Sequence, residues 1–116
     1  MLNKPKYSLF ANTKYAIQGL FDLFKTESSF RLELLVLLIS IPIIIFIDKS
    51  MLEKLFLFSS IMLILVVEAI NGAVERVVDL VSPDYNELAG KAKDAGSAAV
   101  FISISLAVVI WGVILW

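Results

Sequence analysis

Glu68 and Glu75 stand in the middle of a largely apolar stretch of this sequence, "LILVVEAINGAVERVVDL" at residues 63–80. Glu68 and Glu75 are seven residues apart, so on a helix with about 100° per residue they lie within about 20° of each other. Asn71 and Asp79 continue the same face towards the end of the stretch. An ionisable side chain inside a membrane span is costly and usually functional. These four residues, the polar stripe, are therefore a candidate site.

The next segment, "KAKDAGSAA", supplies groups that can face the polar stripe. Lys93 and Ser97 are four residues apart and share a helix face, and Asp94 follows Lys93 directly. The small residues around them allow two helices to approach closely in a membrane. A simpler alternative is an ion pair of Lys93 with Glu75 or Asp79 that only stabilises the packing of the helices.

The residue types in this region favour phosphoryl transfer. The chain has no His and no Cys, which excludes thiol nucleophiles and the usual zinc sites. Clustered carboxylates suit Mg²⁺, which is often held by one or two of them together with substrate phosphates. Lys93 would bind the transferring phosphate by its charge, and Glu68, deeper in the membrane, would act as general base. No P-loop is present, because Gly90 and Lys91 are followed by Ala92.

Three apolar segments must position these groups. With 59% hydrophobic and 18% charged residues, the chain has too few polar side chains to cover a small soluble domain. We expect an all-α membrane protein that forms a single domain over residues 1–116. Its three transmembrane helices are expected at about residues 30–47, 52–80 and 91–116, with a turn at 81–90.

A further helix is expected before the first span, at about residues 8–26. Its apolar side chains recur at helical spacing, which predicts an amphipathic helix on the membrane surface. A helix packed against a partner protein is the alternative. The apolar positions are Phe10, Ile17, Leu20, Phe21 and Phe24.

The ten Lys and Arg residues indicate how the chain is oriented. Only Lys49 and Lys54 lie in the short loop between the first two spans, and the positive-inside rule places that loop outside the cytoplasm. The N-terminus is then cytoplasmic, on the side where ATP is found. A net charge of −1 argues against a nucleic-acid partner. The cytoplasmic basic residues are Lys4, Lys6, Lys14, Lys25, Arg31, Arg76, Lys91 and Lys93.

The segments "SSIMLILVVEAINGAVERVVD" and "YNELAGKAKDAGSAAV", with "ESSFRLE" earlier, resemble the small integral-membrane diacylglycerol kinase family of bacteria. The resemblance runs from about residue 15 to the C-terminus. It implies an inner-membrane enzyme that uses ATP and Mg²⁺ to convert diacylglycerol into phosphatidic acid. It also implies a homotrimer in which neighbouring subunits complete each active site. Some family members phosphorylate undecaprenol instead, but the turn here is more similar to the diacylglycerol branch.

The resemblance also assigns roles to individual residues. Glu68 matches the general base, Asn71 and Lys93 match residues next to the transferring phosphate, and Glu27 and Glu75 match the metal ligands. Other positions match residues that contact the nucleotide, namely Tyr15, Asp84, Tyr85, Asn86, Lys93 and Asp94. The lipid-side positions are Ala16, Phe30, Arg31, Glu33, Glu68 and Ser97. The sequence departs from the best-known members at Ala16, Leu32 and Asn86, which bears on the preferred lipid.

Two other classes of protein are consistent with an acidic residue inside a span. A small proton-coupled multidrug exporter would use Glu68 to exchange a proton for a cationic substrate. It would have no need of Lys93, Asp94 or Glu75, and such exporters typically have an even number of helices. A structural subunit without catalytic activity would use the polar stripe only to direct assembly.

Overall fold

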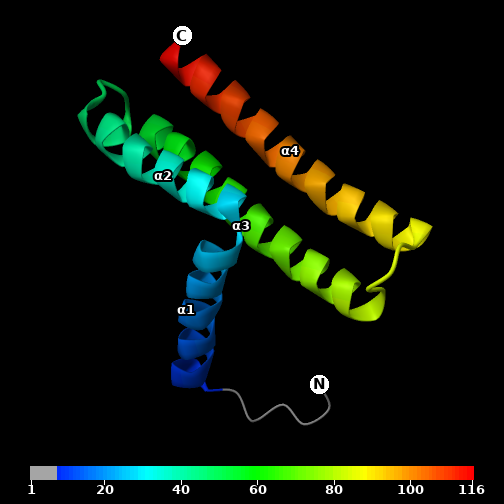
Figure 1. Ribbon diagram of the computed structural model, residues 1–116. Helices are drawn as coiled ribbons and strands as arrows, with labels where there is room; N and C mark the ends of the chain where they lie inside the picture. The colour runs from blue at the N-terminus through cyan, green and yellow to red at the C-terminus, as the bar shows by residue number, and fades with distance from the viewer. Residues whose placement is uncertain (1–7) are drawn as a thin grey trace.

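The computed structural model describes residues 8–116, which form four helices joined by short connections (Figure 1). Three of them are long and apolar enough to cross a membrane, so the predicted all-α fold with three spans is confirmed. Lys4 and Lys6, two of the basic residues used to predict the orientation, lie outside the described residues. The helices are α1 (Leu9–Thr26), α2 (Ser28–Phe46), α3 (Met51–Val81) and α4 (Glu87–Leu115).

The turn between α3 and α4 is shorter than the sequence suggested. Asn86 adopts an extended backbone conformation, and its Oδ1 accepts hydrogen bonds from two backbone N–H groups of the first turn of α4, at 2.9 and 3.2 Å. This is the arrangement of an N-cap, and it lets the helix begin at Glu87. Residues 87–90 of the predicted turn at 81–90 therefore belong to α4, and the start of the third span at about residue 91 stays a prediction.

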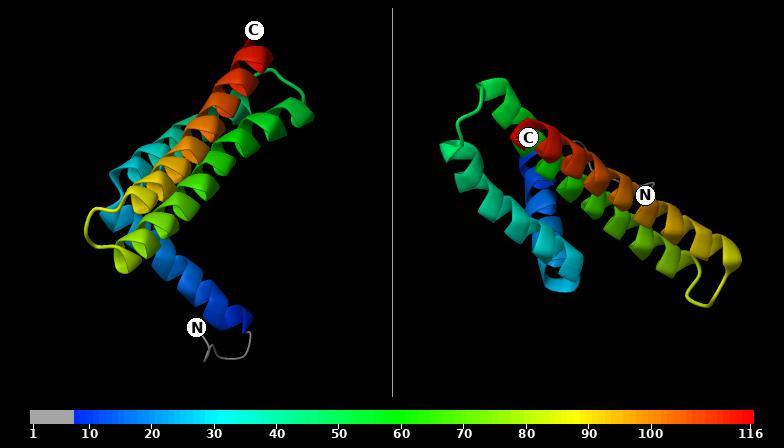
Figure 2. Two further views of the ribbon diagram at one scale, coloured as in Figure 1. Left: turned by 90° about the vertical axis from the view of Figure 1, so that its right-hand side faces the viewer. Right: turned by 90° about the horizontal axis from the view of Figure 1, so that it is seen from above.

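The second span is the central helix of the bundle. The N-terminal half of α3 packs against α2, and α4 runs alongside α3 in the opposite direction (Figures 1 and 2). Leu57 of α3 is fully buried, and Ile61 and Ile64 pack with Ala107 of α4. Most other apolar side chains of α2 and α4 are exposed, as expected for helices that face lipid.

The first helix projects away from this bundle (Figure 1). A single extended residue, Glu27, separates α1 from α2, with φ −113° and ψ 107°. Near this junction, Leu23 of α1 and Phe30 of α2 are buried together with Leu65 of α3. Many other apolar side chains of α1 are exposed, and Phe10 is 90% exposed. That they lie on a membrane surface stays a prediction.

Candidate active site

Glu68 lies in the middle of α3 and is only 5% exposed. The hydroxyl of Ser29, in the first turn of α2, donates a hydrogen bond to Glu68 Oε1 at 2.7 Å. Glu33, one turn further along α2, is close enough for its charge to interact with that of Glu68. Glu33 Oε2 is buried and accepts no hydrogen bond from any residue in 8–116. A buried polar atom without a partner is costly, so this oxygen calls for a hydrogen-bond donor that residues 8–116 do not supply.

Asn71 is the next member of the polar stripe and is 8% exposed. Its Nδ2 donates a long hydrogen bond to Glu75 Oε1 at 3.5 Å. Its Oδ1 is buried and has no hydrogen-bond partner among the described residues. Gly96 of α4 lies against this amide, because a Cβ at that position would overlap Asn71 Oδ1. The glycine therefore lets α4 approach the polar stripe.

The end of the polar stripe is in contact with water. Lys93 Nζ lies 2.6 Å from Asp79 Oδ1, and the two side chains are 40% and 63% exposed. This is one of the two ion pairs that the sequence suggested as a structural alternative. An exposed pair of this kind contributes little to stability, so it does not explain why these residues are present. Lys93 can exchange Asp79 for another anion at low cost.

The two predicted metal ligands have different hydrogen-bond partners among the described residues. Glu75 is partly exposed next to Asn71, whereas Glu27 Oε1 accepts a hydrogen bond from Arg76 Nη1 at 3.3 Å. In the part of the chain that the structure describes, no group of three or more acidic side chains could hold a metal ion. A metal ion bound to either carboxylate would therefore need further ligands from a substrate or another subunit.

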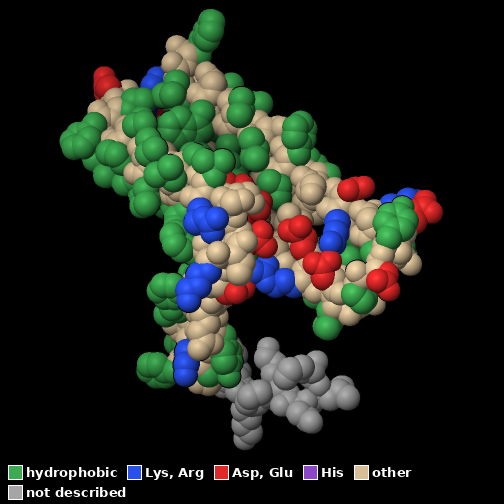
Figure 3. All heavy atoms as spheres, in the orientation of Figure 1, with side chains coloured by type: hydrophobic (Ala, Val, Ile, Leu, Met, Phe, Trp, Pro, Cys, Tyr) green, Lys and Arg blue, Asp and Glu red, His purple; other side chains and the backbone are tan. Residues whose placement is uncertain are grey.

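Arg76 is a residue whose role the sequence analysis missed, because it was used only as a positive charge. It binds Asp22, Thr26 and Glu27, which all lie in or next to α1. These partners are about fifty residues away along the chain, and no spacing rule could have found them. Figure 3 shows acidic and basic side chains gathered where α1 meets α3 and near the adjoining ends of α3 and α4.

The predicted nucleotide-binding residues are exposed and distributed over several elements. Tyr15 lies on α1, Asp84 and Tyr85 lie in the turn after α3, and Asp94 lies on α4. No hydrogen bond or ion pair within residues 8–116 joins Tyr15 to the turn. Asn86 has a structural task as the N-cap of α4.

The predicted lipid-side residues occupy three kinds of environment. Phe30 belongs to the apolar core, and Ala16 and Ser97 are exposed. Arg31 Nη1 donates hydrogen bonds to two carbonyl groups in the last turns of α1, at 2.7 and 3.2 Å. Glu33 lies close to Glu68.

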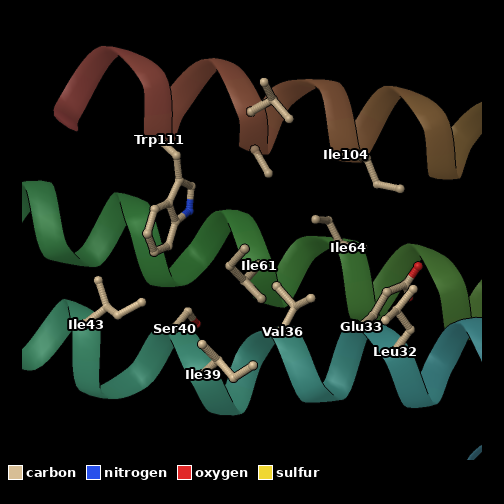
Figure 4. A pocket seen from close by; sticks show the side chains of 12 residues that line it. Leu32, Glu33, Val36, Ile39, Ser40, Ile43, Ile61, Ile64, Ile104 and Trp111 are labelled. Carbon is tan, nitrogen blue, oxygen red and sulfur yellow. The ribbon is translucent and has the colours of Figure 1, made fainter. Parts of the chain in front are cut away.

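A groove of about 490 Å³ is lined by side chains of α2, α3 and α4 (Figure 4). Its wall is almost entirely apolar and includes Val36, Ile64 and Ile104. Glu33 lies at one end, and Trp111 lies towards the other, where its indole N–H donates to Ser60 Oγ at 3.1 Å. The volume lies in the range of about 300–1,000 Å³ that is usual for small-molecule sites.

Comparison with known proteins identifies this arrangement. The sequence profile of the family described as prokaryotic diacylglycerol kinase matches residues 14–115. The chain belongs to this family. It is 42% identical to the diacylglycerol kinase of Haemophilus influenzae, over 93% of this chain and 92% of that protein. It is 41% identical to the diacylglycerol kinase of Escherichia coli K12, over 88% of this chain and 84% of that protein.

Membership of the prokaryotic diacylglycerol kinase family decides among the three classes considered above. The relatives are named for a lipid kinase activity, and the chain matches them over most of its length. An exporter or a structural subunit is therefore no longer needed to account for the polar stripe. With its three apolar helices, this member of the family is a membrane protein.

Proposed function

We propose that the chain transfers the γ-phosphoryl group of ATP to the hydroxyl of diacylglycerol and so produces phosphatidic acid. The observation that carries this proposal is the position of Glu68. Its carboxylate is buried, is held by Ser29, and lies between the apolar groove and the charged end of the helices. A lipid hydroxyl can reach such a carboxylate from one side and a nucleotide from the other. The names of the relatives support the same activity.

The apolar groove is proposed to hold an acyl chain of the acceptor. It opens along the faces of α2 and α4, which would be surrounded by lipid in a membrane. Glu33 lies at one end with its Oε2 atom unpaired, so it can accept a hydrogen bond from the single free hydroxyl of the lipid before Glu68 does. A chain in the groove would then bring the free hydroxyl towards Glu68.

In the proposed reaction, Glu68 accepts the proton of the lipid hydroxyl. The oxygen attacks the γ-phosphorus of ATP, the bond to the β-phosphate oxygen breaks, and ADP leaves. The amide of Asn71 can donate to a phosphate oxygen in place of its long bond to Glu75. Lys93 can leave Asp79 and neutralise negative charge on the transferring group.

Mg²⁺ would enter with ATP as part of that substrate and would neutralise charge on the phosphates. The described residues fit this mode of binding, because Mg²⁺ commonly takes one or two protein carboxylates and otherwise phosphates and water. Glu75 is partly exposed at the correct end of the polar stripe. Glu27 has one oxygen, Oε2, that accepts no hydrogen bond among residues 8–116, so it can serve as a second ligand.

The proposed enzyme is a homotrimer in the bacterial inner membrane with its N-terminus in the cytoplasm. The distribution of the candidate nucleotide-binding residues supports shared active sites, because no hydrogen bond or ion pair joins Tyr15 to Asp84 or Tyr85 within the described part of this chain. We further propose that α1 lies on the membrane surface, where its exposed apolar side chains would be covered by lipid.

The test uses purified protein in mixed micelles with Mg-ATP labelled on the γ-phosphate. Diacylglycerol or undecaprenol is supplied as the acceptor, and the labelled lipid is separated and counted. We expect label in phosphatidic acid. Label only in undecaprenyl phosphate would overturn the proposed acceptor, and no label in either lipid would overturn the proposed kinase activity.

A further inference from the structure

The guanidinium group of Arg76 connects the first helix to the third. Nη2 donates to Asp22 Oδ2 at 2.8 Å and to Thr26 Oγ1 at 2.9 Å. Nη1 donates to Glu27 Oε1 at 3.3 Å and to the Gly72 carbonyl at 3.0 Å. Four acceptors thus surround one side chain, and two of them are carboxylates. We name Arg76, Asp22, Thr26 and Glu27 the Arg76 cluster.

Gly72 of α3 allows α1 to approach α3 closely beside the Arg76 cluster. A Cβ at Gly72 would lie 3.0 Å from Arg76 Nη1 and 3.1 Å from Leu23 Cδ2. Gly72 therefore leaves room for both the guanidinium group and the side chain that α1 buries. Only an arginine presents two nitrogens in a fixed plane to separate acceptors, and a lysine ammonium cannot reproduce that geometry.

The position of Glu27 follows from the position of α1. Glu27 is the only residue between α1 and α2, and its backbone N–H donates to the Leu23 carbonyl of α1 at 2.8 Å. A rotation of α1 about this junction would therefore carry the Glu27 carboxylate away from α3. The Arg76 cluster opposes such a rotation through bonds to two residues of α1 and to Glu27 itself.

From this geometry we propose that Arg76 is a positioning residue for the phosphoryl transfer. It holds α1 against α3, and by doing so it keeps Glu27 beside Gly72 and Arg76, in the part of α3 that also carries Glu75. One oxygen of Glu27 is bound to Arg76, and the other stays available to the Mg²⁺ that accompanies ATP. This inference rests on the proposed function for its kinetic consequence, but the contact between α1 and α3 can be tested without any catalysis.

The structural arm of the test uses the absence of cysteine from the natural chain. Leu23 lies on the buried face of α1 and is 9% exposed, so Leu23→Cys introduces a single protected thiol. We expect Arg76→Ala to make this thiol react with a water-soluble maleimide about tenfold faster, because losing the charged hydrogen bonds lets α1 open locally. Lys25→Ala is the matched control, since it removes a basic side chain from α1 that forms no ion pair within residues 8–116. That control should leave the reaction rate unchanged.

The kinetic arm of the test uses Asp22→Ala, which removes the shortest hydrogen bond of the Arg76 guanidinium group without changing any proposed ligand. Both Asp22→Ala and Arg76→Ala should raise the KM for Mg-ATP while leaving the KM for diacylglycerol unchanged. The two effects should be less than additive in the double variant, because both substitutions break the same contact. Arg76→Lys should recover part of the loss.

The two arms separate this inference from the proposed function. An unchanged thiol reaction rate in Arg76→Ala, with helical content intact by circular dichroism, would overturn the inference whatever the kinase assay shows. Equal increases in both KM values, or a fall in kcat alone, would also overturn it. Faster thiol reaction in a protein that transfers no phosphate would support the contact between the helices and reject the kinase activity.

Discussion

The two ends of the polar stripe on α3 differ in how they meet water. At one end, Glu68 and Asn71 are 5% and 8% exposed, and neighbouring helices fix them. At the other end, Lys93 and Asp79 form an ion pair whose side chains are 40% and 63% exposed. The first end has a fixed geometry, whereas the second can change partners freely.

This difference matches two tasks in a single reaction. A proton acceptor has to lie within hydrogen-bond reach of one particular hydroxyl, and buried packing can hold it there. A site for a charged, hydrated nucleotide has to open to water and can be completed by the nucleotide itself. We therefore expect substitutions at the buried end to lower kcat and substitutions at the exposed end to act mainly on Mg-ATP.

The largest effect is expected for Glu68→Gln. The amide keeps the shape of the side chain but cannot accept the proton, so kcat should fall by about 10²–10⁴-fold while the protein stays folded. The measurement is labelled phosphate transfer with circular dichroism on the same sample. Asp48→Asn, an exposed carboxylate in the opposite loop, is the control and should keep full activity.

A smaller loss is expected for Gly96→Ala. The added methyl group would overlap Asn71 Oδ1, so Asn71 or α4 must move. A displacement of about 1 Å at a catalytic position can cost about 10²-fold in rate, and overpacking costs about 1–3 kcal/mol of stability. Unfolding in denaturing micelles and kcat are both measured. Gly112→Ala should change neither, because an added Cβ there meets nothing within 4 Å.

Ser29→Ala tests whether α2 positions Glu68, the proposed general base. It removes the 2.7 Å hydrogen bond to Glu68 and leaves the carboxylate in place. A hydrogen bond to a charged group is worth about 1.5–3 kcal/mol, and a loss of about 1–2 kcal/mol of this in the transition state lowers kcat by about 5–30-fold. Ser29→Thr should retain most of the activity, since it keeps the hydroxyl. Full activity in Ser29→Ala would mean that other contacts orient Glu68.

The smallest effect is expected for Asp79→Asn at the exposed end. The ion pair with Lys93 is open to water, so the unfolding midpoint should not change and kcat should stay within about twofold of wild type. A clear loss of stability would revive the view that the polar residues of α3 serve helix packing alone. The comparison is made by denaturation in micelles at low and at moderate salt.

Periodicity and composition predicted a large part of this fold. The spans were visible because apolar runs of that length are typical of helices that cross a membrane, and α1 was visible because its apolar positions recur every three or four residues. The predicted turn before α4 was too long because Asn86, a turn former, here acts as the N-cap of the helix. Spacing alone could not distinguish these two roles.

The polar stripe was predictable because its members lie on a single helix, where spacing determines direction. The contacts between helices were not predictable in this way. Ser29 and Glu68 are brought together by the packing of α2 on α3, and Arg76 reaches Asp22 across a junction whose angle no local pattern encodes. The groove that ends near Trp111 likewise depends on how three helices pack.

The division of tasks along α3 is tested most directly by measuring Mg-ATP binding and kcat on the same three proteins. Wild type, Glu68→Gln and Glu75→Gln are compared by isothermal titration with Mg-ATP and by phosphate transfer at saturating diacylglycerol. We predict that Glu68→Gln binds Mg-ATP as wild type does but turns over very slowly, and that Glu75→Gln binds Mg-ATP more weakly and needs more Mg²⁺. Substantial turnover by Glu68→Gln, or an unchanged Mg²⁺ requirement in Glu75→Gln, would contradict the account.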